Sequence, residues 1–333
     1  MKTSTVATDA LFWMDGLLAT ELIEVSTDPK SLSDGDFWAV STTYEGGFRA
    51  AKFGNLKRSD FSTQIESESP SGKWASSTTR EEYLAYVELI REEIANGGVY
   101  QVNACRRLSI KSTAKLSSAF RRILNLNPAP YSSYLKWGDI EIASASPELF
   151  LQRTGLQIKT SPIKGTKQSA TEEFGVKDRA ENVMIVDLMR NDLGQICKPG
   201  SITVPDLLRD EVHPGLSHLV SDVSGILRDE ITWPEIFEAL LPAGSISGAP
   251  KSSAMKIIAE NEKVSRAEYC GVIGWVHGDQ ALLSVAIRTF WRDGEYINFG
   301  TGAGITWGSD AAAEWEETQL KAARLISIVG GEL

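Results

Sequence analysis

The sequence predicts a mixed α+β fold, because strand-like and helix-like segments alternate along the chain in no regular order. A parallel sheet would require a repeated strand–helix–strand rhythm, and none is visible. The chain has 333 residues, of which 42% are apolar and 23% are charged, as in an ordinary globular protein. That length is enough for one large domain or for two modest ones.

The amino-terminal part, residues 1–75, is predicted to be a short β-rich segment that packs on the rest of the chain. Residues 37–40 and 48–53 are apolar, strand-like runs separated by Asp, Gly and Ser turns. Residues 62–77 are rich in serine and also contain a proline and a glycine, so this run is the one plausible internal linker. The main domain is therefore predicted to span residues 76–333.

Helices are predicted where apolar residues recur at helical spacing. A Thr-Thr-Arg-Glu run at 78–81 can form an N-terminal capping box, and apolar residues at 83, 87, 90 and 94 follow it on one face. Two further helices are predicted over about 177–193 and from after Ser309 to Val329. Strand-like segments are found at 141–144, 270–277, 281–290 and 296–299.

Net charge and cysteine content restrict the class of protein. The net charge of −10 argues against nucleic acid or an anionic membrane surface as the main partner. The three cysteines, Cys105, Cys197 and Cys270, are widely spaced outside any CxxC pattern, which is typical of reduced cysteines in a cytosolic protein. The apolar run at 10–14 is too short for a signal peptide, and no later segment approaches eighteen consecutive apolar residues. We therefore expect a soluble, cytoplasmic protein.

Lys164, in the run Ser-Pro-Ile-Lys-Gly-Thr at 161–166, is a candidate nucleophile. A lysine is nucleophilic only when neutral, and burial or a nearby positive charge can lower its pKa from about 10.4. Pro162 stiffens the approach to this residue, and Gly165 lets a ligand come close to the backbone after it. The alternative is a solvated lysine on a Pro/Gly turn.

Two pairs of carboxylates lie at helical spacing. Asp178 and Glu181 are three residues apart on one predicted helix, and Glu314 and Glu317 repeat that spacing at the start of the last one. If the two helices meet, the expected occupant is Mg²⁺, which takes one or two carboxylates and keeps other oxygen ligands. The absence of His and Cys from both pairs disfavours zinc. The alternative is that all four are solvated surface acids.

Two glycine-containing loops, a lone arginine and a histidine could bind anions or move protons. The runs 300–305 (GTGAGI) and 245–251 (SISGAPK) can present backbone N–H groups to a carboxylate, although each could equally be a tight turn. Arg288 ends an apolar strand and is either a carboxylate clamp or an edge residue. His218 lies in an apolar stretch and could be a base or a core side chain.

Taken together and in this order, these motifs resemble those of the chorismate-utilising enzymes. The resemblance covers about residues 76–329, and so many spaced motifs are jointly very specific. The matching runs are QVN at 101–103, SPELF at 146–150, PIKGT at 162–166, DRAEN at 178–182, MIVDLMRNDL at 184–193, HLVS at 218–221, SGAPK at 247–251, YCG at 269–271, IRT at 287–289, GAGI at 302–305 and EWEET at 314–318.

The resemblance implies an anthranilate synthase component I-like, chorismate-binding fold, in which two antiparallel sheets are flanked by helices. It also implies chorismate as substrate and Mg²⁺ as cofactor. Carried over by motif, Glu181 and Glu317 would hold the metal, with Asp178 and Glu314 supporting them. Residues 76–333 would then form the chorismate-binding catalytic domain.

The same resemblance implies a set of substrate-binding residues. The metal would grip the ring carboxylate of chorismate together with backbone N–H groups around Gly302, Ala303 and Gly304. Arg288 and Tyr269 would receive the enolpyruvyl carboxylate. The matching motifs add Thr166, Ser247 and Lys251 to this set.

Lys164 marks the position where members of the family divide. Anthranilate, isochorismate and salicylate synthases usually carry a small residue there, whereas the branch that aminates chorismate at C4, the aminodeoxychorismate synthases, typically has the Pro-Ile-Lys-Gly-Thr form. In that branch the lysine is thought to attack C2 while a glutamate, here Glu148, protonates the departing C4 hydroxyl; ammonia then adds at C4 and expels the lysine. His218 matches a histidine that helps pyruvate loss in anthranilate synthase, and its role here stays open.

The resemblance also has implications for the partner subunit and for the alternative functions. The chain contains no candidate glutaminase domain, so a separate glutamine amidotransferase subunit, or free ammonia, is expected to supply the nitrogen. The tryptophan-binding motif of the long anthranilate synthases is not evident, since Leu17-Leu18-Ala19-Thr20 is at most a faint match. Anthranilate synthase component I, isochorismate or salicylate synthase, and a non-catalytic chorismate-binding subunit remain the alternatives.

Overall fold

A computed structural model describes residues 9–62, 68–167, 173–213 and 216–333. The helices in these residues are η1 (Pro29–Asp34, a 3₁₀ helix), α1 (Arg80–Ala95), α2 (Leu116–Leu126), α3 (Val176–Gly194), α4 (Trp233–Leu240), α5 (Gly244–Ser247), α6 (Lys251–Asn261) and α7 (Ala311–Val329). The strands are β1 (Leu11–Met14), β2 (Leu17–Ser26), β3 (Phe37–Thr42), β4 (Phe48–Arg58), β5 (Ala75–Ser76), β6 (Gln101–Lys111), β7 (Tyr131–Trp137), β8 (Ile140–Ser146), β9 (Leu149–Thr154), β10 (Gln157–Ser161), β11 (Ile163–Lys167), β12 (Thr203–His213), β13 (Leu216–Ile226), β14 (Gly248–Ala249), β15 (Val272–His277), β16 (Gln280–Val285), β17 (Thr289–Asp293) and β18 (Tyr296–Ile305).

The pairings between these strands are antiparallel, and they follow two arms that meet at β4. One arm runs β2–β1–β7–β8–β17–β18–β6. The other runs β3–β15–β16–β9–β10–β13–β12. Strand β4 pairs with β2 on one side and with β3 on the other, so the two sheets are continuous there. The predicted α+β class with antiparallel sheets and flanking helices is confirmed.

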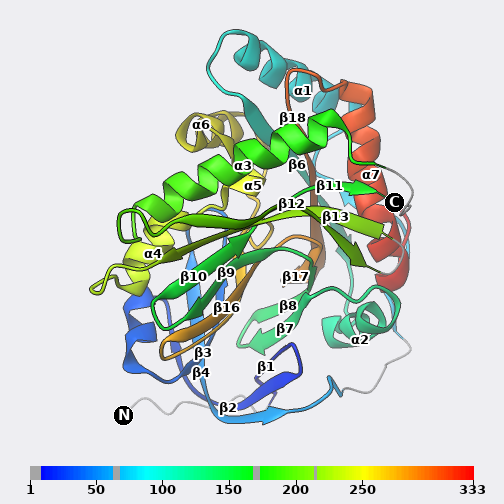
Figure 1. Ribbon diagram of the computed structural model, residues 1–333. Helices are drawn as coiled ribbons and strands as arrows, with labels where there is room; N and C mark the ends of the chain where they lie inside the picture. The colour runs from blue at the N-terminus through cyan, green and yellow to red at the C-terminus, as the bar shows by residue number, and fades with distance from the viewer. Residues whose placement is uncertain (1–8, 63–67, 168–172, 214–215) are drawn as a thin grey trace.

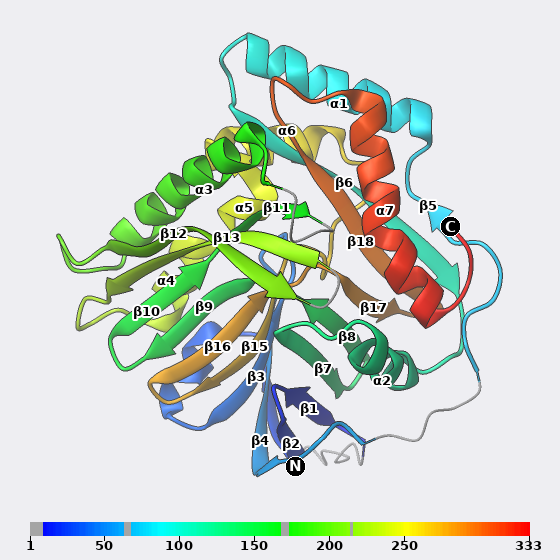
Figure 2. The same ribbon diagram turned by 45° about the vertical axis from the view of Figure 1, so that its right-hand side comes forward.

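Helices cover several of the strands that carry the motifs quoted above. Helix α3 lies across β13 and β11, and α7 packs along β18 (Figures 1 and 2). Helix α1 packs on α7, and α6 packs on β6. These contacts bring α3 and α7, which carry the two carboxylate pairs, to the end of the molecule where β11 and β18 lie (Figure 2).

Three apolar clusters hold this arrangement. The largest contains side chains of both arms, such as Phe12, Leu135 and Leu283, together with the apolar face of α3. A second packs α2 and the end of α7 on one arm, around Phe120 and Phe290. The third joins α1, α6 and the start of α7 to β6 and β18. Apolar burial of this kind is the main favourable term in folding.

The amino-terminal strands belong to both arms. Strand β1 pairs with β7, and β3 pairs with β15, so residues before 60 pair with strands that come more than 100 residues later. Strand β5, at the end of the serine-rich run, pairs with β6. Residues 1–8 and part of the predicted linker, 63–67, lie outside the described residues.

Several predicted elements differ in detail from the observed ones. The capping box of α1 is formed by Thr79 and Glu82, one residue later than predicted, because Thr79 has the extended backbone that the cap requires. The strand predicted over 281–290 is two strands, β16 and β17, separated at Arg288, whose φ is +52°. The run 300–305 is not a loop: it continues β18 and pairs with β6. In the described residues no helix is both long enough and apolar enough to span a membrane.

Candidate active site

Lys164 is the second residue of β11, and its ammonium points into the protein. Its Nζ donates to the backbone oxygen of Ser245 at 2.8 Å. The side chain is half-buried. Burial lowers the pKa of Lys164, while the negative charges of Glu181 and Glu148 oppose that shift and the positive charge of Lys321 adds to it. The structure therefore does not place Lys164 on a solvated turn.

The local backbone explains how Lys164 reaches this position. The pairing of β11 with β13 shifts in register between Ile163 and Thr166, so the strand is irregular around the lysine. Gly165 has a φ of +80°, and a Cβ at this residue would lie 2.9 Å from the Cβ of Asp178. A side chain is therefore excluded at residue 165, and its absence lets the first turn of α3 approach the strand.

Glu148 lies between β8 and β9 and is 3% exposed. Burial raises the pKa of Glu148 to about 7, although hydrogen bonds with the Ser245 side chain and the Ile163 backbone, and the charge of Lys164, act in the opposite direction. Its own N–H donates to Ser146 Oγ at 3.2 Å, which fixes the backbone. Ser245 therefore contacts both Lys164 and Glu148, and we refer to these three residues as the Lys164–Glu148–Ser245 group.

The predicted metal-binding carboxylates come from α3 and α7, which meet here. Lys177 Nζ lies 3.8 Å from Glu181 Oε1 and 3.2 Å from Glu314 Oε1, so the two helices present their carboxylates to one shared cation. Burial raises the pKa of Glu181, with Lys164 and Lys177 opposing. Asp178 instead accepts the N–H of Gly175 at 3.0 Å, as expected for the first turn of a helix.

Glu317 lies at the outer edge of this region, with its side chain 47% exposed. Its carboxylate is 2.6 Å from Lys321 Nζ. Burial acts to raise the pKa of Glu317, but the charge and hydrogen bond of Lys321 outweigh it and the pKa is lowered. Within the described ranges, no three His, Cys, Asp or Glu side chains are already gathered closely enough to hold a metal ion. The donor set of Glu181, Glu317 and Glu314 nevertheless fits Mg²⁺, because it consists of carboxylate oxygens, each of which already pairs with a lysine.

Three further predicted residues lie near the ends of strands. Arg288 Nη2 is 3.4 Å from His218 Nε2, and His218 is 2% exposed on β13. Burial lowers the pKa of Arg288, and the charge of Glu148 opposes that shift. Tyr269 is buried, and a Cβ on Gly300 would lie 2.0 Å from its ring. The glycine at 300 therefore makes room for the tyrosine.

Strand β18 also presents backbone groups. Among the described strands, β17 pairs with β18 only up to Phe299, so beyond that residue β6 alone flanks β18. Every second backbone N–H group in the run that contains Gly302 and Gly304 then points away from β6 and can donate to a ligand. The side chain of Ala303 packs in the apolar cluster that also contains residues of α1 and α6. Lys321 Nζ donates to the oxygen of Gly302 at 3.0 Å.

The remaining predicted residues make contacts within the protein. Ser247 Oγ donates to the oxygen of Ala243 at 3.0 Å. Lys251 Nζ is 2.6 Å from Asp192 Oδ2. The backbone of Thr166 lies opposite His218 in the β11–β13 pairing, and the side chain of Thr166 is outside the described part of the chain.

Gln101 is a candidate that the sequence reasoning quoted as part of a motif but gave no role. It is 1% exposed, and neither Oε1 nor Nε2 of its amide has a hydrogen-bond partner. A Cβ on Gly304 would lie 2.3 Å from Gln101 Nε2 and 3.7 Å from Lys164 Nζ, so the amide and the ammonium flank the same glycine. An unsatisfied buried amide costs about 1–3 kcal/mol, which a bound ligand can recover.

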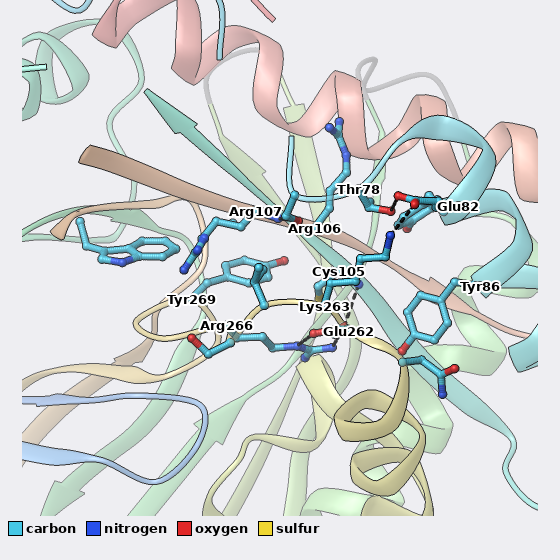
Figure 3. A pocket seen from close by; sticks show the side chains of 17 residues that line it. Thr78, Glu82, Tyr86, Cys105, Arg106, Arg107, Glu262, Lys263, Arg266 and Tyr269 are labelled. Atoms are coloured by element: carbon cyan, nitrogen blue, oxygen red, sulfur yellow. Dashed lines mark hydrogen bonds and ion pairs between the residues drawn. The ribbon is translucent and has the colours of Figure 1, made fainter. Parts of the chain in front are cut away.

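A polar pocket opens beside Tyr269 at the edge of β6 (Figure 3). Its lining includes Cys105, Arg107 and the ion pair of Arg266 with Glu262, whose Nη2 and Oε1 atoms are 2.6 Å apart. The Cys105 N–H donates to Glu262 Oε1 at 3.1 Å. Cys105, Cys197 and Cys270 are all buried and free. Tyr269 and Gly300 also line this pocket, and Gly300 lies two residues before Gly302 on β18.

Positive side chains concentrate at the site although the protein is acidic. Lys164, Lys321 and Arg288 come from three different elements, and Lys177 adds a fourth positive charge beside the carboxylates. The same region also holds the carboxylates of Glu148, Glu181, Glu314 and Glu317. A carboxylate of a small molecule can still pair with individual cations there, although the net charge of the chain is −10.

The family model described as chorismate binding enzyme matches residues 49–327. The chain therefore belongs to the chorismate-binding enzyme family. Among curated relatives, it is 38% identical over 265 residues to aminodeoxychorismate synthase component 1 of Salmonella typhimurium, which covers 76% of this chain and 58% of the relative. It is 37% identical over 274 residues to an anthranilate synthase component 1 of Haloarcula marismortui, which covers 79% of this chain and 56% of the relative.

Solved structures show the same fold. Anthranilate synthase component I of Streptococcus pneumoniae superposes with a TM-score of 0.81 at 23% identity, covering 97% of this chain and 94% of that one. The menaquinone-specific isochorismate synthase of Escherichia coli gives 0.80 at 18% identity, covering 98% and 90%. The two curated relatives are longer, and the chain spans less than three fifths of their length.

Proposed function

We propose that the protein is a component 1 aminodeoxychorismate synthase, which converts chorismate and ammonia to 4-amino-4-deoxychorismate. The observation that carries this proposal is the placement of Lys164 beside Glu148, with Ser245 in contact with both. A buried amine next to a buried carboxyl is a nucleophile–acid pair. Relatives named aminodeoxychorismate synthase component 1 and relatives named anthranilate synthase component 1 match at similar identity, so the distinction depends on this pair.

Lys164 acts as the nucleophile. Burial favours its neutral amine, which attacks C2 of chorismate. The bond between C4 and its hydroxyl oxygen breaks in the same step, and both ring double bonds shift by one position, from C1=C2 and C5=C6 to C1=C6 and C4=C5. The lysine nitrogen is then bonded to C2, and the hydroxyl leaves as water after it receives a proton.

Glu148 supplies that proton. Its pKa of about 7 leaves a substantial protonated fraction near neutral pH, which a general acid needs. Ammonia then forms a bond to C4, the bond between C2 and the lysine nitrogen breaks, and Lys164 departs as a neutral amine. The proton that ammonia loses returns to the Glu148 carboxylate, so the acid is ready for the next turnover.

The chain offers separate positions for the two carboxylates of chorismate. Arg288 and His218 are in contact just before the start of β17, and these two residues and the buried Tyr269 suit the enolpyruvyl carboxylate. Backbone N–H groups of Gly302 to Gly304, and the ammonium of Lys321, suit the ring carboxylate. Gln101 would form hydrogen bonds with polar groups on the ring close to Lys164.

Mg²⁺ is proposed as cofactor, held by Glu181 and Glu317 with Glu314 and Asp178 in support. When bound, the metal neutralises a substrate carboxylate and adds positive charge near the reacting amine. In its absence Lys177 neutralises Glu181 and Glu314, and Lys321 neutralises Glu317. The positive charge of Lys321 also lowers the pKa of Lys164.

Ammonia is proposed to come from a separate glutamine amidotransferase subunit. The relatives that carry the component 1 name suggest a second component. The enzyme is proposed to work in the cytoplasm.

One assay tests the proposed function. Purified protein is incubated with chorismate, Mg²⁺ and an ammonium salt at alkaline pH, with and without aminodeoxychorismate lyase. Formation of 4-aminobenzoate only when the lyase is present supports the proposal. Formation of anthranilate, isochorismate or salicylate would instead assign the chain to another branch of the family, and no chorismate consumption would favour a binding subunit.

A further inference from the structure

Ser245 is the residue that joins the two proposed catalytic groups. Its backbone oxygen accepts from Lys164 Nζ at 2.8 Å, and its side chain is hydrogen-bonded to Glu148. A shift of Ser245 therefore changes the direction of the amine and the environment of the carboxyl together. The elements that fix Ser245 are as important to the geometry as the two groups themselves.

Ser245 lies on α5, a single turn of four residues that cannot hold its own position. Gly244 packs tightly on α3, since a Cβ there would lie 2.4 Å from Leu188 Cδ2. On the other side the chain passes through Gly248, with a φ of +142°, into α6. Contacts between α3 and the start of α6 therefore help to hold α5 in place, together with Arg266, whose Nη1 donates to the oxygen of Ile246 at 2.9 Å.

The strongest such contact is a buried ion pair. Lys251, the first residue of α6, places Nζ 2.6 Å from Asp192 Oδ2 on α3. The same ammonium donates to the oxygen of Leu240, the last residue of α4, at 3.4 Å. The side chains of Asp192 and Lys251 are 3% and 16% exposed. One ammonium thus ties together α3, α4 and α6, which surround α5.

The Asp192–Lys251 pair also lies close to Glu148, the proposed general acid. Glu148, Ser245 and Asp192 line one small pocket together with Thr160, Leu240 and Ala243. The neutral pair with Lys251 keeps the Asp192 carboxylate from acting as an unpaired negative charge beside Glu148. Removing one partner from a buried pair leaves an uncompensated charge, which is much more harmful than losing a surface ion pair.

We propose that Asp192 and Lys251 are positioning residues for the reaction, whose ion pair holds α5 so that Ser245 contacts Lys164 and Glu148 at once. This inference rests on the proposed function and differs from the role that sequence resemblance suggested for Lys251, which was to bind substrate. The lysine ammonium is already bound to Asp192 and Leu240, and it acts through Ser245 instead.

The test compares Lys251→Met with wild type in steady-state kinetics. We expect kcat to fall by about 30-fold or more while KM for chorismate changes by less than about 3-fold, because the catalytic geometry is disturbed and the carboxylate-binding residues are not. Lys251→Arg keeps the charge and should recover kcat to within about 5-fold of wild type. Asp192→Asn should reproduce the loss seen in Lys251→Met.

Arg292→Met provides the matched control. Arg292 forms a comparably buried pair with Glu141 at 2.9 Å, on β17 and β8. We expect this variant to lose thermal stability to a similar degree while kcat stays within about 2-fold of wild type. An equal loss of kcat in both variants would reduce the role of Lys251 to general stability and overturn the inference.

A second readout does not depend on activity. Backbone amides of residues 244–247 should exchange with solvent faster in Lys251→Met than in wild type, and at the wild-type rate in Arg292→Met. Unchanged exchange in Lys251→Met, or a raised KM with an unchanged kcat, would refute positioning even if the enzyme makes aminodeoxychorismate. If the wild-type protein forms another chorismate product, the proposed function is refuted. The kinetic comparison of Lys251→Met with Arg292→Met can then be made by measuring that product, and the exchange comparison is unaffected.

Discussion

The ammonium of Lys164 and the backbone oxygen of Ser245 are 2.8 Å apart, which joins β11 to the short helix α5 at the centre of the site. This bond holds the lysine away from solvent and toward Glu148. It also gives the ammonium a neutral partner that does not stabilise its positive charge as a carboxylate would. The amine is consequently kept in place without being locked in its charged form.

Replacement of Lys164 by alanine should abolish C4 amination, with a loss of at least about 10³-fold in kcat, because the covalent route requires its amine. Chorismate binding should weaken by less than about 5-fold, since the carboxylate-binding groups remain. Product formation and equilibrium binding measure the two quantities separately. Lys159→Met, on β10 beside Asp222, removes a more exposed lysine and should leave both unchanged. Unchanged turnover in Lys164→Ala would remove this lysine from the mechanism.

The pKa of Glu148 predicts a pH-dependent stability. Its folded pKa of about 7 lies above the ordinary value of 4.5, so its stabilising contribution is complete below pH 4.5 and is lost as the pH rises to about 7. Glu148→Gln should therefore gain about 3 kcal/mol relative to wild type between pH 4.5 and pH 8. Chemical denaturation at several pH values measures this difference. Thr160→Val, in the same pocket, should show a pH-independent difference from wild type, and a pH-independent difference between Glu148→Gln and wild type would contradict the assignment.

The same pKa predicts the pH profile of the reaction. A general acid must carry its proton, so kcat should fall as the pH rises above about 7. The Lys164 amine must be neutral, so the rate should also fall toward acid pH, which gives a bell-shaped profile. Glu148→Gln should lose at least about 100-fold in kcat and should no longer show the alkaline limb. An alkaline limb that persists in this variant would belong to another group.

The unsatisfied amide of Gln101 predicts opposite effects on stability and on binding. Gln101→Leu should leave the free protein as stable as wild type, or more stable by about 1 kcal/mol, because a buried unpaired amide is removed. It should raise KM for chorismate by about 10-fold or more. Thermal unfolding and steady-state kinetics check the two parts. Ser41→Ala removes another buried unpaired group, on β3, and should change KM by less than about 2-fold; a matching KM change there would refute a specific role.

The shared cation position between α3 and α7 predicts a measurable Mg²⁺ effect on the free protein. Millimolar Mg²⁺ should raise the unfolding temperature of wild type, and Glu181→Gln or Glu317→Gln should shift the response to higher Mg²⁺. Lys177→Met should shift it to lower Mg²⁺, since this lysine competes for the carboxylates. Glu316→Gln, on the exposed face of α7, is the control and should behave as wild type. An identical response in all variants would place the metal elsewhere.

The sequence was sufficient for the fold class and for the set of chemical groups, but not for their contacts. Helical spacing predicted that Asp178 and Glu181 share one helix and that Glu314 and Glu317 share another, and α3 and α7 carry them. It could not predict that Lys177 lies between Glu181 and Glu314, because that contact depends on how two helices far apart in sequence pack. The loop expected at 300–305 is a strand, because a glycine-rich run reads as a turn until its partner β6 is known.

The roles of Gln101 and Ser245 were hidden for a related reason. Nothing in a Gln-Val-Asn run indicates that the amide is buried without partners beside Gly304. Likewise, the resemblance placed Lys251 among the substrate-binding residues, and its contact with Asp192 depends on packing between α6 and α3. Contacts of this kind are tertiary, so only the folded chain reveals them.

The central claim is that Lys164 forms a covalent bond to the substrate, and peptide mass spectrometry tests it most directly. Wild type mixed with chorismate and Mg²⁺ in the absence of ammonia is quenched in acid, digested and analysed. We predict that the peptide containing Lys164 gains the mass of chorismate less one water, and that Glu148→Gln slows this labelling. Rapid amination of chorismate by an enzyme whose Lys164 peptide never carries that mass, at any quench time, would contradict the account.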